Sequence, residues 1–174
     1  MRAALEARVG ALHLRQRLGI EEAFEAKLFG QSFGFFHLEN WYSVHAFIRN
    51  SLRLVGLYRR GQRNALDLRL REHDLVVRGL PAAFEGYRIL HLSDLHLDMR
   101  HDFPHQLIES VRGLQYDLCV LTGDYRGRTY GCFEAALNAL ALVRTHLSGP
   151  VYGILGNHDT IRLVPGMEAM GVRM

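Results

Sequence analysis

Short apolar runs and longer amphipathic segments alternate in the second half of the chain. The stretches 87–98, 117–124 and 150–159 each contain an apolar run of strand length. Between them, apolar residues recur every three or four positions over 104–114 and 132–147, which predicts two helices that each bury one face. Strands that alternate with helices indicate an α/β fold with a mostly parallel sheet and right-handed crossovers.

Local signals mark the ends of these helices. Pro104 suits the first turn of the first helix, with Asp102 as a candidate cap. Gly149 and Pro150 follow the second helix and end it. The last residues, VPGMEAMGVRM, predict a further helix that leads into a further strand.

Two stretches with alternating apolar and polar residues precede this region. Residues 65–71 (ALDLRLR) show the period of two that is typical of a half-buried strand. Residues 73–81 (HDLVVRGLP) predict a second strand that ends at Gly79 and Pro81. Together they predict a hairpin at the edge of the sheet.

The first 63 residues are predicted to be a helical extension, and residues 64–174 the main domain. Apolar residues at helical spacing support this division. Three helices are predicted, over residues 2–18, 21–29 and 40–59. Gly19 ends the first, Gly30 and Gly34 mark a turn after the second, and the third ends near Gly61.

Aromatic residues are concentrated between positions 33 and 58, and two interpretations of them stay open. In the first, the helices form a hairpin whose aromatic face packs on the main domain or on a second copy. In the second, the segment lies on a membrane surface, with Trp41 in the headgroup region and Arg59, Arg60 and Arg63 against anionic lipid.

Composition excludes several classes of protein. The chain has 174 residues, of which 48% are hydrophobic, enough for a packed domain and an extension. The net charge of +3 is small and most arginines are scattered, so no nucleic acid is expected as a partner. Cys119 and Cys132 do not form a CxxC pair, so neither a thiolate metal site nor a disulfide framework is expected. Because no signal peptide and no apolar window of membrane-spanning length is found, we expect a cytoplasmic protein, soluble or peripheral to a membrane.

Polar side chains follow each of the three central strands. Asp94 and His96 come directly after the first, and Asp124 follows a glycine after the second. The third is followed by Gly156, Asn157, His158 and Asp159. In α/β sheets, sites lie outside the carboxyl ends of the strands, so we expect these groups to converge on one pocket.

Carboxylate, amide and imidazole groups together suit divalent ions such as Mn, Fe or Zn. Two such ions can hold a phosphate and stabilise the attacking and leaving oxygens of an in-line displacement, with a shared water or hydroxide as nucleophile. His158 is suited to protonate the leaving oxygen or to stabilise the transition-state charge, and Asp159 to orient its other ring nitrogen.

The motifs DLH, GD and GNHD, in this order at successive strand ends, resemble the first three motifs of the calcineurin-like metallophosphoesterase superfamily. The resemblance covers about residues 80–164. It implies a two-layer β-sandwich flanked by helices that hydrolyses phosphomonoesters or phosphodiesters with two divalent metal ions. It also implies these roles: Asp94 and His96 on the first metal, Asp124 bridging both, Asn157 on the second, and His158 at the phosphate.

The details of the motifs narrow the substrate. The LSDLHLD form resembles the bacterial small-molecule and lipid-related branch, which implies a phosphate-ester small molecule or a lipid headgroup as partner. The protein phosphatase branch continues its second motif as GDxVDRG, whereas this chain has GDYRG.

The superfamily also supplies histidines from later GH and GHxH motifs, and none follows Asp159 here. The resemblance therefore implies a fold without its C-terminal half, in which each metal lacks ligands. The alternative to an enzyme is a catalytically incompetent fragment that acts as a binding or interaction module. A Rossmann-type nucleotide binder is disfavoured, because no GxGxxG follows any of the three strands.

Overall fold

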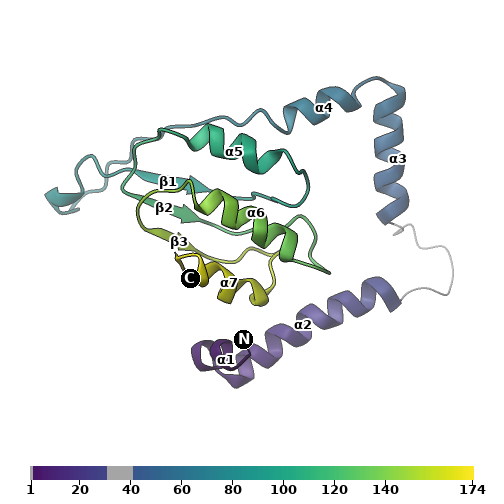
Figure 1. Cartoon of the computed structure of the whole chain (residues 1–174), viewed down its shortest axis with the longest axis horizontal. Coiled ribbons are helices and arrows are strands. Elements are labelled where there is room, and N and C mark those ends of the chain that lie inside the picture. The colour runs from purple at the N-terminus through teal and green to yellow at the C-terminus, as the bar shows by residue number, and fades with distance from the viewer. Residues whose placement is uncertain (1, 31–40) are drawn as a thin grey trace.

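The structure is a computed structural model that describes residues 2–30 and 41–174, with side chains described over 2–26 and 47–174. Four described strands form one parallel sheet in the order β1-β2-β3-β4 (Figure 1). Cys119 is paired with Leu90 on one side and with Val151 on the other. The strands are β1 (Ile89–Leu92), β2 (Leu118–Leu121), β3 (Val151–Gly153) and β4 (Val172–Arg173).

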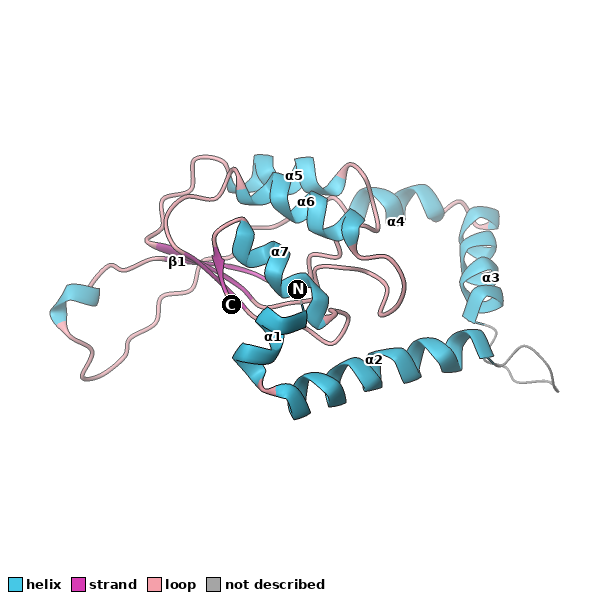
Figure 2. Ribbon diagram, turned by 60° about the horizontal axis from the view of Figure 1, so that its bottom comes forward, coloured by secondary structure: helices cyan, strands magenta, loops and turns pink. Residues whose placement is uncertain are grey.

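Helices α5 (Phe103–Val111), α6 (Glu134–Arg144) and α7 (Val164–Ala169) cover one face of this sheet (Figures 1 and 2). Two short 3-10 turns, Ala82–Phe84 and Ile161–Leu163, complete the main domain. The sheet and the helices share one apolar core whose central members are Leu90, Leu92, Cys119, Leu121, Val151, Leu107, Ile108, Leu140, Val143 and Met167. The predicted α/β fold is confirmed, including the helix and strand predicted after Asp159.

The opposite face of the sheet is more open. Along β1 and β3, buried residues alternate with exposed ones, and Ile89 and Tyr152 are 57% and 41% exposed. Ile154, the residue directly after β3, is 61% exposed. Of the two-layer sandwich that the family resemblance implies, the described residues therefore form one sheet.

The predicted edge hairpin is wrong. Within the described residues 65–81 there is no strand, and β1 is an edge of the sheet that pairs with β2 alone. An alternating pattern produces a strand only where one face finds a partner, and here Leu75 and Val76 are 83% and 95% exposed. Leu68 is the residue of this segment that packs against the core.

Two helix boundaries near the N-terminus also differ from the prediction. Helix α1 (Arg2–Val9) ends at Gly10, which has φ of +82°, and α2 (Ala11–Gly30) continues through Gly19. The left-handed conformation at Gly10 ends the helix, whereas Gly19 stays helical at a small propensity cost.

The third predicted helix is divided in two. Helix α3 (Trp41–Leu54) is separated from α4 (Tyr58–Asn64) by Gly56, which has φ of +71°, and α4 passes through Gly61. The turn predicted at Gly34 falls outside the described residues. The division of the chain at residue 63 stays a prediction.

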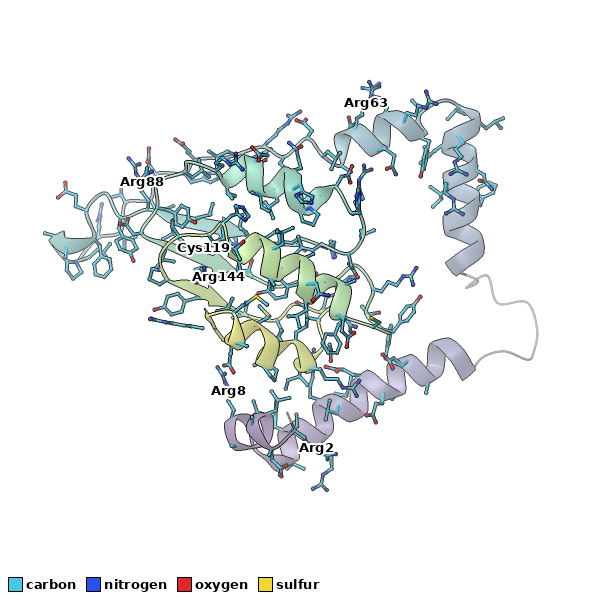
Figure 3. All side chains as sticks on the ribbon, in the orientation of Figure 1. Arg2, Arg8, Arg63, Arg88, Cys119 and Arg144 are labelled. Atoms are coloured by element: carbon cyan, nitrogen blue, oxygen red, sulfur yellow. The ribbon has the colours of Figure 1, made fainter. Side chains whose placement is uncertain are left out.

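The N-terminal helices make unequal contact with the main domain. Leu5 of α1 and Leu14 of α2 form a small apolar cluster with Ile161 and Val164. Arg8 extends from α1 to form an ion pair with Glu168 of α7 (Figure 3). Helix α3, in contrast, lies away from the sheet and its covering helices (Figure 1). No helix in the described part of the chain is long and apolar enough to cross a membrane.

The two cysteines are expected to differ sharply in reactivity. Cys119 is fully buried in the sheet (Figure 3), and burial raises the pKa of its thiol to about 12, whereas Cys132 is exposed. A maleimide at pH 8 should therefore modify one thiol in the native protein and two in urea, because the thiolate is the reactive form. Mass spectrometry of peptides from the native sample should place the label on Cys132. Rapid native labelling of Cys119 would contradict the buried position of β2.

Candidate metal centre

The loops after β1 and β2 stay paired beyond the ends of their strands. Asp94 N donates to Gly123 O at 3.2 Å, and His96 N donates to Asp124 O at 2.9 Å. Leu97 N continues this series to Tyr125 O at 2.8 Å. Backbone hydrogen bonds, not side-chain packing alone, therefore set the positions of the two loops that bear candidate ligands.

Asp94, His96 and Asp124 are the non-glycine residues with positive φ among the described part of the chain, at 53°, 41° and 55°. Asp, Asn and His adopt this left-handed conformation more readily than other residues, but at a cost of about 1–3 kcal/mol each. Such conformations persist only where the surrounding structure fixes them, and they cluster at functional sites. Three of them on one small surface mark the convergence of the two loops.

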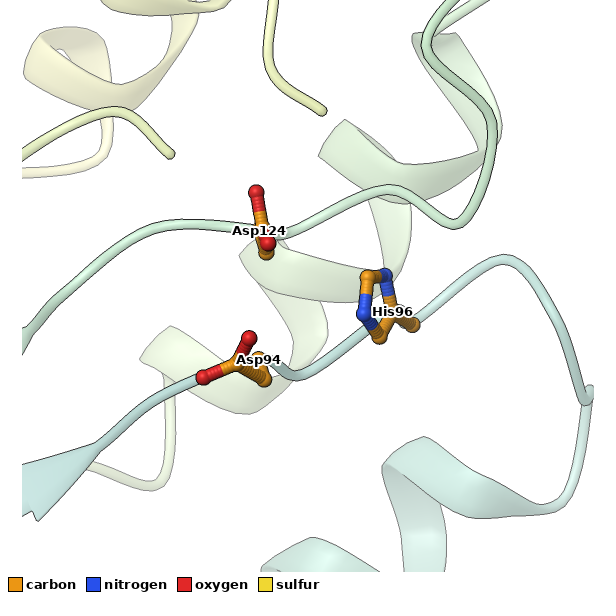
Figure 4. A group of neighbouring side chains, drawn as sticks. All are labelled: Asp94, His96 and Asp124. Atoms are coloured by element: carbon orange, nitrogen blue, oxygen red, sulfur yellow. The ribbon is translucent and has the colours of Figure 1, made fainter. Parts of the chain in front are cut away.

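The side chains of these three residues point toward one another (Figure 4). One ligand atom from each, two carboxylate oxygens and an imidazole nitrogen, lies within 4.8 Å of the others. Asp94 is exposed, while Asp124 is 9% exposed. This donor set suits a divalent cation, since hard oxygens and a borderline nitrogen are combined at one point.

His96 is held with one ring nitrogen available. Its Nδ1 lies 2.8 Å from the carbonyl oxygen of Arg126. A carbonyl can only accept, so Nδ1 carries the proton and Nε2 has the free lone pair. Metal-binding histidines are commonly oriented by a hydrogen bond of this kind.

The third loop reaches the same point through Asp124. His158 N donates to Asp124 Oδ1 at 2.9 Å, and the His158 ring centroid lies 5.0 Å from that of His96. His158 Nδ1 is 3.0 Å from Gly127 O, so this ring too keeps Nε2 available. Asn157 directly precedes His158 on this loop, and its side chain is exposed.

Asp159 does not orient His158, and that part of the prediction is wrong. Its carboxylate is 2% exposed and accepts from the backbone N–H groups of Asp124 at 2.7 Å, Tyr125 at 2.9 Å and Gly156 at 2.8 Å. Burial raises the pKa of this carboxyl, and the backbone donors oppose the rise. Asp159 therefore joins the second and third loops, while the carbonyl of Gly127 orients His158.

Two further residues that stabilise the site were not predicted from the sequence. The buried Arg126 donates from Nε to His158 O at 2.5 Å, and Asp98 accepts from Gly127 N at 2.6 Å. Both act on backbone atoms across loops, and no spacing pattern along the chain announces such contacts. The GDYRG sequence places Arg126 beside a candidate ligand, which is the one available signal.

Gly123 and Gly156 allow the second and third loops to cross closely. A Cβ on Gly123, which has φ of +92°, would lie 2.5 Å from Gly156 Cα. A Cβ on Gly156 would overlap Asp124 N and Oδ1 and lie 2.8 Å from Asp124 Cγ. The glycines of both motifs are required here by backbone approach.

Gly156→Ala should therefore displace the Asp124 carboxylate. We expect it to lower the free energy of unfolding by about 1–3 kcal/mol, the usual cost of overpacking, and to weaken Mn²⁺ binding as well. Urea unfolding and calorimetric titration measure the two effects. Gly61→Ala is the matched control, because a Cβ there meets nothing within 4 Å. Unchanged Mn²⁺ affinity in Gly156→Ala would show that the loops do not need this close crossing.

Comparison with known proteins agrees with this arrangement. Residues 87–171 match the family model described as calcineurin-like phosphoesterase. This part of the chain is therefore similar to that family. The chain is also 32% identical over 105 residues to a protein of Bacillus subtilis (strain 168) named as the uncharacterized metallophosphoesterase YkoQ. That alignment covers 59% of this chain and 38% of the relative, so the chain spans about two fifths of the length of the relative that it matches.

The phosphoesterase segment contains the three loops just described and excludes the N-terminal helices. The structure brings Asp94, His96 and Asp124 together as candidate ligands. Asn157 and His158 lie on the adjoining loop. The catalytic and ligand roles of these residues stay predictions.

Proposed function

We propose that this chain contributes to metal-dependent hydrolysis of a phosphomonoester or phosphodiester. The observation that supports this most strongly is the convergence of Asp94, His96 and Asp124 in left-handed backbone conformations within a phosphoesterase segment. Two divalent ions, drawn from Mn, Fe or Zn, would neutralise phosphate charge and lower the pKa of an attacking water.

The residues of this chain divide the work. Asp94 and His96 would hold the first ion, Asp124 would bridge to the second, and Asn157 would complete the second. The preformed Nδ1 hydrogen bond of His96 favours binding through Nε2. His158, whose ring centroid lies 5.0 Å from that of His96, would protonate the leaving oxygen or stabilise charge on the phosphate.

The substrate that we propose is a small-molecule phosphate ester or a lipid headgroup. The test is the rate of hydrolysis of an aryl phosphodiester and an aryl phosphomonoester by purified protein with Mn²⁺, compared with Asp94→Ala and with added chelator. We expect the rate to fall to background in both comparisons. Equal rates in the native and variant proteins would reject the site.

A second candidate, a binding module without turnover, is favoured by one observation. Within the described residues, the cluster of metal-type side chains contains Asp94, His96 and Asp124 and no further histidine. Two ions ordinarily require more protein ligands than this. Mn²⁺ binding that depends on Asp124, with no hydrolysis of either ester, would support the binding module instead.

We also propose that α3 and α4 contact an anionic membrane surface. Phe47 and Leu54 are 72% and 89% exposed, and their seven-residue spacing places them on one side of α3. Val55, in the turn directly after α3, is 62% exposed. Arg59, Arg60 and Arg63 follow on α4 and would lie against lipid phosphates. An exposed apolar face beside a basic cluster is typical of helices that lie in a membrane interface.

Sedimentation with vesicles tests the membrane proposal. Phosphatidylglycerol vesicles should retain the protein, and phosphatidylcholine vesicles should retain much less. Phe47→Ser should weaken binding at all salt concentrations, while Arg60→Gln should weaken it mainly at low salt. Arg112→Gln, at the residue directly after α5, is the control for loss of one exposed positive charge. Equal retention by both lipids would reject the proposal.

A further inference from the structure

Helix α2 carries a polar stripe that faces the loops of the candidate metal centre. Arg17, Glu21 and Glu25 are four residues apart and therefore lie on one side of the helix. Leu14, one turn earlier, is 1% exposed and packs against Ile161. The side of α2 that contacts the rest of the protein is thus apolar near the N-terminal end of the helix and polar where the helix passes the second and third loops of the site.

Glu21 makes the densest set of these contacts. Its carboxylate accepts from Thr160 Oγ1 at 2.5 Å, Ile161 N at 3.0 Å and Arg17 Nε at 2.9 Å. Its side chain is 15% exposed, compared with 66% for Glu22, whose ion pair with Arg162 lies on the surface. Thr160 and Ile161 directly follow Asp159, so Glu21 holds the end of the loop that bears Asn157 and His158.

Two neighbours in the stripe extend this contact to both sides. Arg17 donates from its terminal nitrogen to Asp159 O at 2.9 Å. Glu25 accepts from Gly131 N at 2.9 Å, in the long loop that follows Asp124. The helix therefore contacts the second and the third loop of the site, which Asp159 also joins from inside.

The acidic residues of α2 also stabilise a buried cation. Arg126 is 3% exposed and donates to the backbone of His158, Gly131 and Thr129. Glu21 and Glu25 line one small cavity together with Arg126, which places two carboxylates near this buried guanidinium. A buried charge requires such compensation, so removal of Glu21 would weaken the hold of Arg126 on His158 as well.

We infer that α2, although it lies outside the phosphoesterase segment, is part of the support of the metal centre, and that Glu21 is a positioning residue for the Asn157–His158 loop. The structural part of this inference stands alone, and its effect on turnover rests on the proposed function. The N-terminal extension then does more than lead into the domain. Its Glu21 holds the end of the third loop of the site, although the two segments are 140 residues apart in the chain.

Hydrogen exchange of the metal-free protein tests the structural part. In Glu21→Ala, amides over 156–163 should exchange about tenfold faster than in the native protein, since three hydrogen bonds are lost. In the matched control Glu22→Ala, the same amides should be unchanged. If Glu21→Ala does not fold, Glu21→Gln keeps the size and one acceptor and should give a smaller increase. Identical exchange in the Glu21 and Glu22 variants would overturn the inference.

Metal binding and kinetics separate positioning from simple stabilisation. Glu21→Ala should bind Mn²⁺ about tenfold more weakly and, where hydrolysis is measurable, lower kcat with KM changed less than about twofold. Glu21→Gln should recover part of both. A lower Tm with unchanged Mn²⁺ affinity and kcat would overturn the positioning role. Absence of hydrolysis by the native protein would count against the proposed function alone, because the exchange and Mn²⁺ measurements do not depend on it.

Discussion

Asp124→Asn should reduce Mn²⁺ affinity by at least about 100-fold, while the protein stays folded. Asp124 lies at the meeting point of the three loops, and its carboxylate faces both Asp94 and His96. An asparagine oxygen can still accept from His158 N, so the hydrogen bond at 2.9 Å is retained while the charge is removed. Loss of an orienting group alone costs 10–100-fold, and loss of a direct charged ligand should cost more.

Calorimetric titration and Mn²⁺ electron paramagnetic resonance measure this change. Asp74→Asn removes one exposed carboxylate elsewhere and should leave the affinity as it is. An Asp124→Asn protein that binds Mn²⁺ as the native protein does would remove the basis for placing the ion between the first two loops.

Asp159→Ala should lower the free energy of unfolding by about 3–5 kcal/mol. The carboxylate accepts from four backbone N–H groups in two different loops, those of Asp124, Tyr125, Arg126 and Gly156, and each buried donor left without a partner costs about 1–3 kcal/mol. Since small domains are stable by only about 5–15 kcal/mol, this is a large fraction of the total. Urea unfolding followed by circular dichroism measures the loss.

A carboxylate at the protein surface provides the comparison for Asp159. Asp117 accepts a single hydrogen bond, from Arg88 N at 2.6 Å, at an exposed position. Asp117→Ala should therefore cost about 1 kcal/mol or less, because water replaces the lost acceptor. Equal losses in the two variants would mean that Asp159 does not hold the loops together.

The sequence predicted the candidate ligands of the site better than the residues that hold its loops in place. Asp94, His96 and Asp124 follow strands, and the carboxyl ends of parallel strands lie at one edge, so their convergence was predictable. The role of Asp159 was not, because it binds backbone atoms, and any residue supplies a backbone N–H. Glu21 had no signal at all, since its partners Thr160 and Ile161 are close only in the folded chain.

The errors in the fold have a common physical origin. The alternation over residues 65–81 satisfies the strand pattern, but a pattern does not specify whether a neighbouring strand is present to accept its hydrogen bonds. Gly10 and Gly19 are the same residue type in similar surroundings, and only Gly10 adopts a positive φ. A glycine in the sequence marks a position where a helix can end, and tertiary packing decides whether it does.

The left-handed backbone at the three candidate ligands has a consequence for the order of assembly. Neighbouring loops fix these conformations through main-chain hydrogen bonds, so the chain adopts the unfavourable dihedral angles when it folds, before any cation binds. A cation would then bind at a preformed site. Ion uptake should be rapid, and the far-ultraviolet circular dichroism spectrum should be the same before and after it.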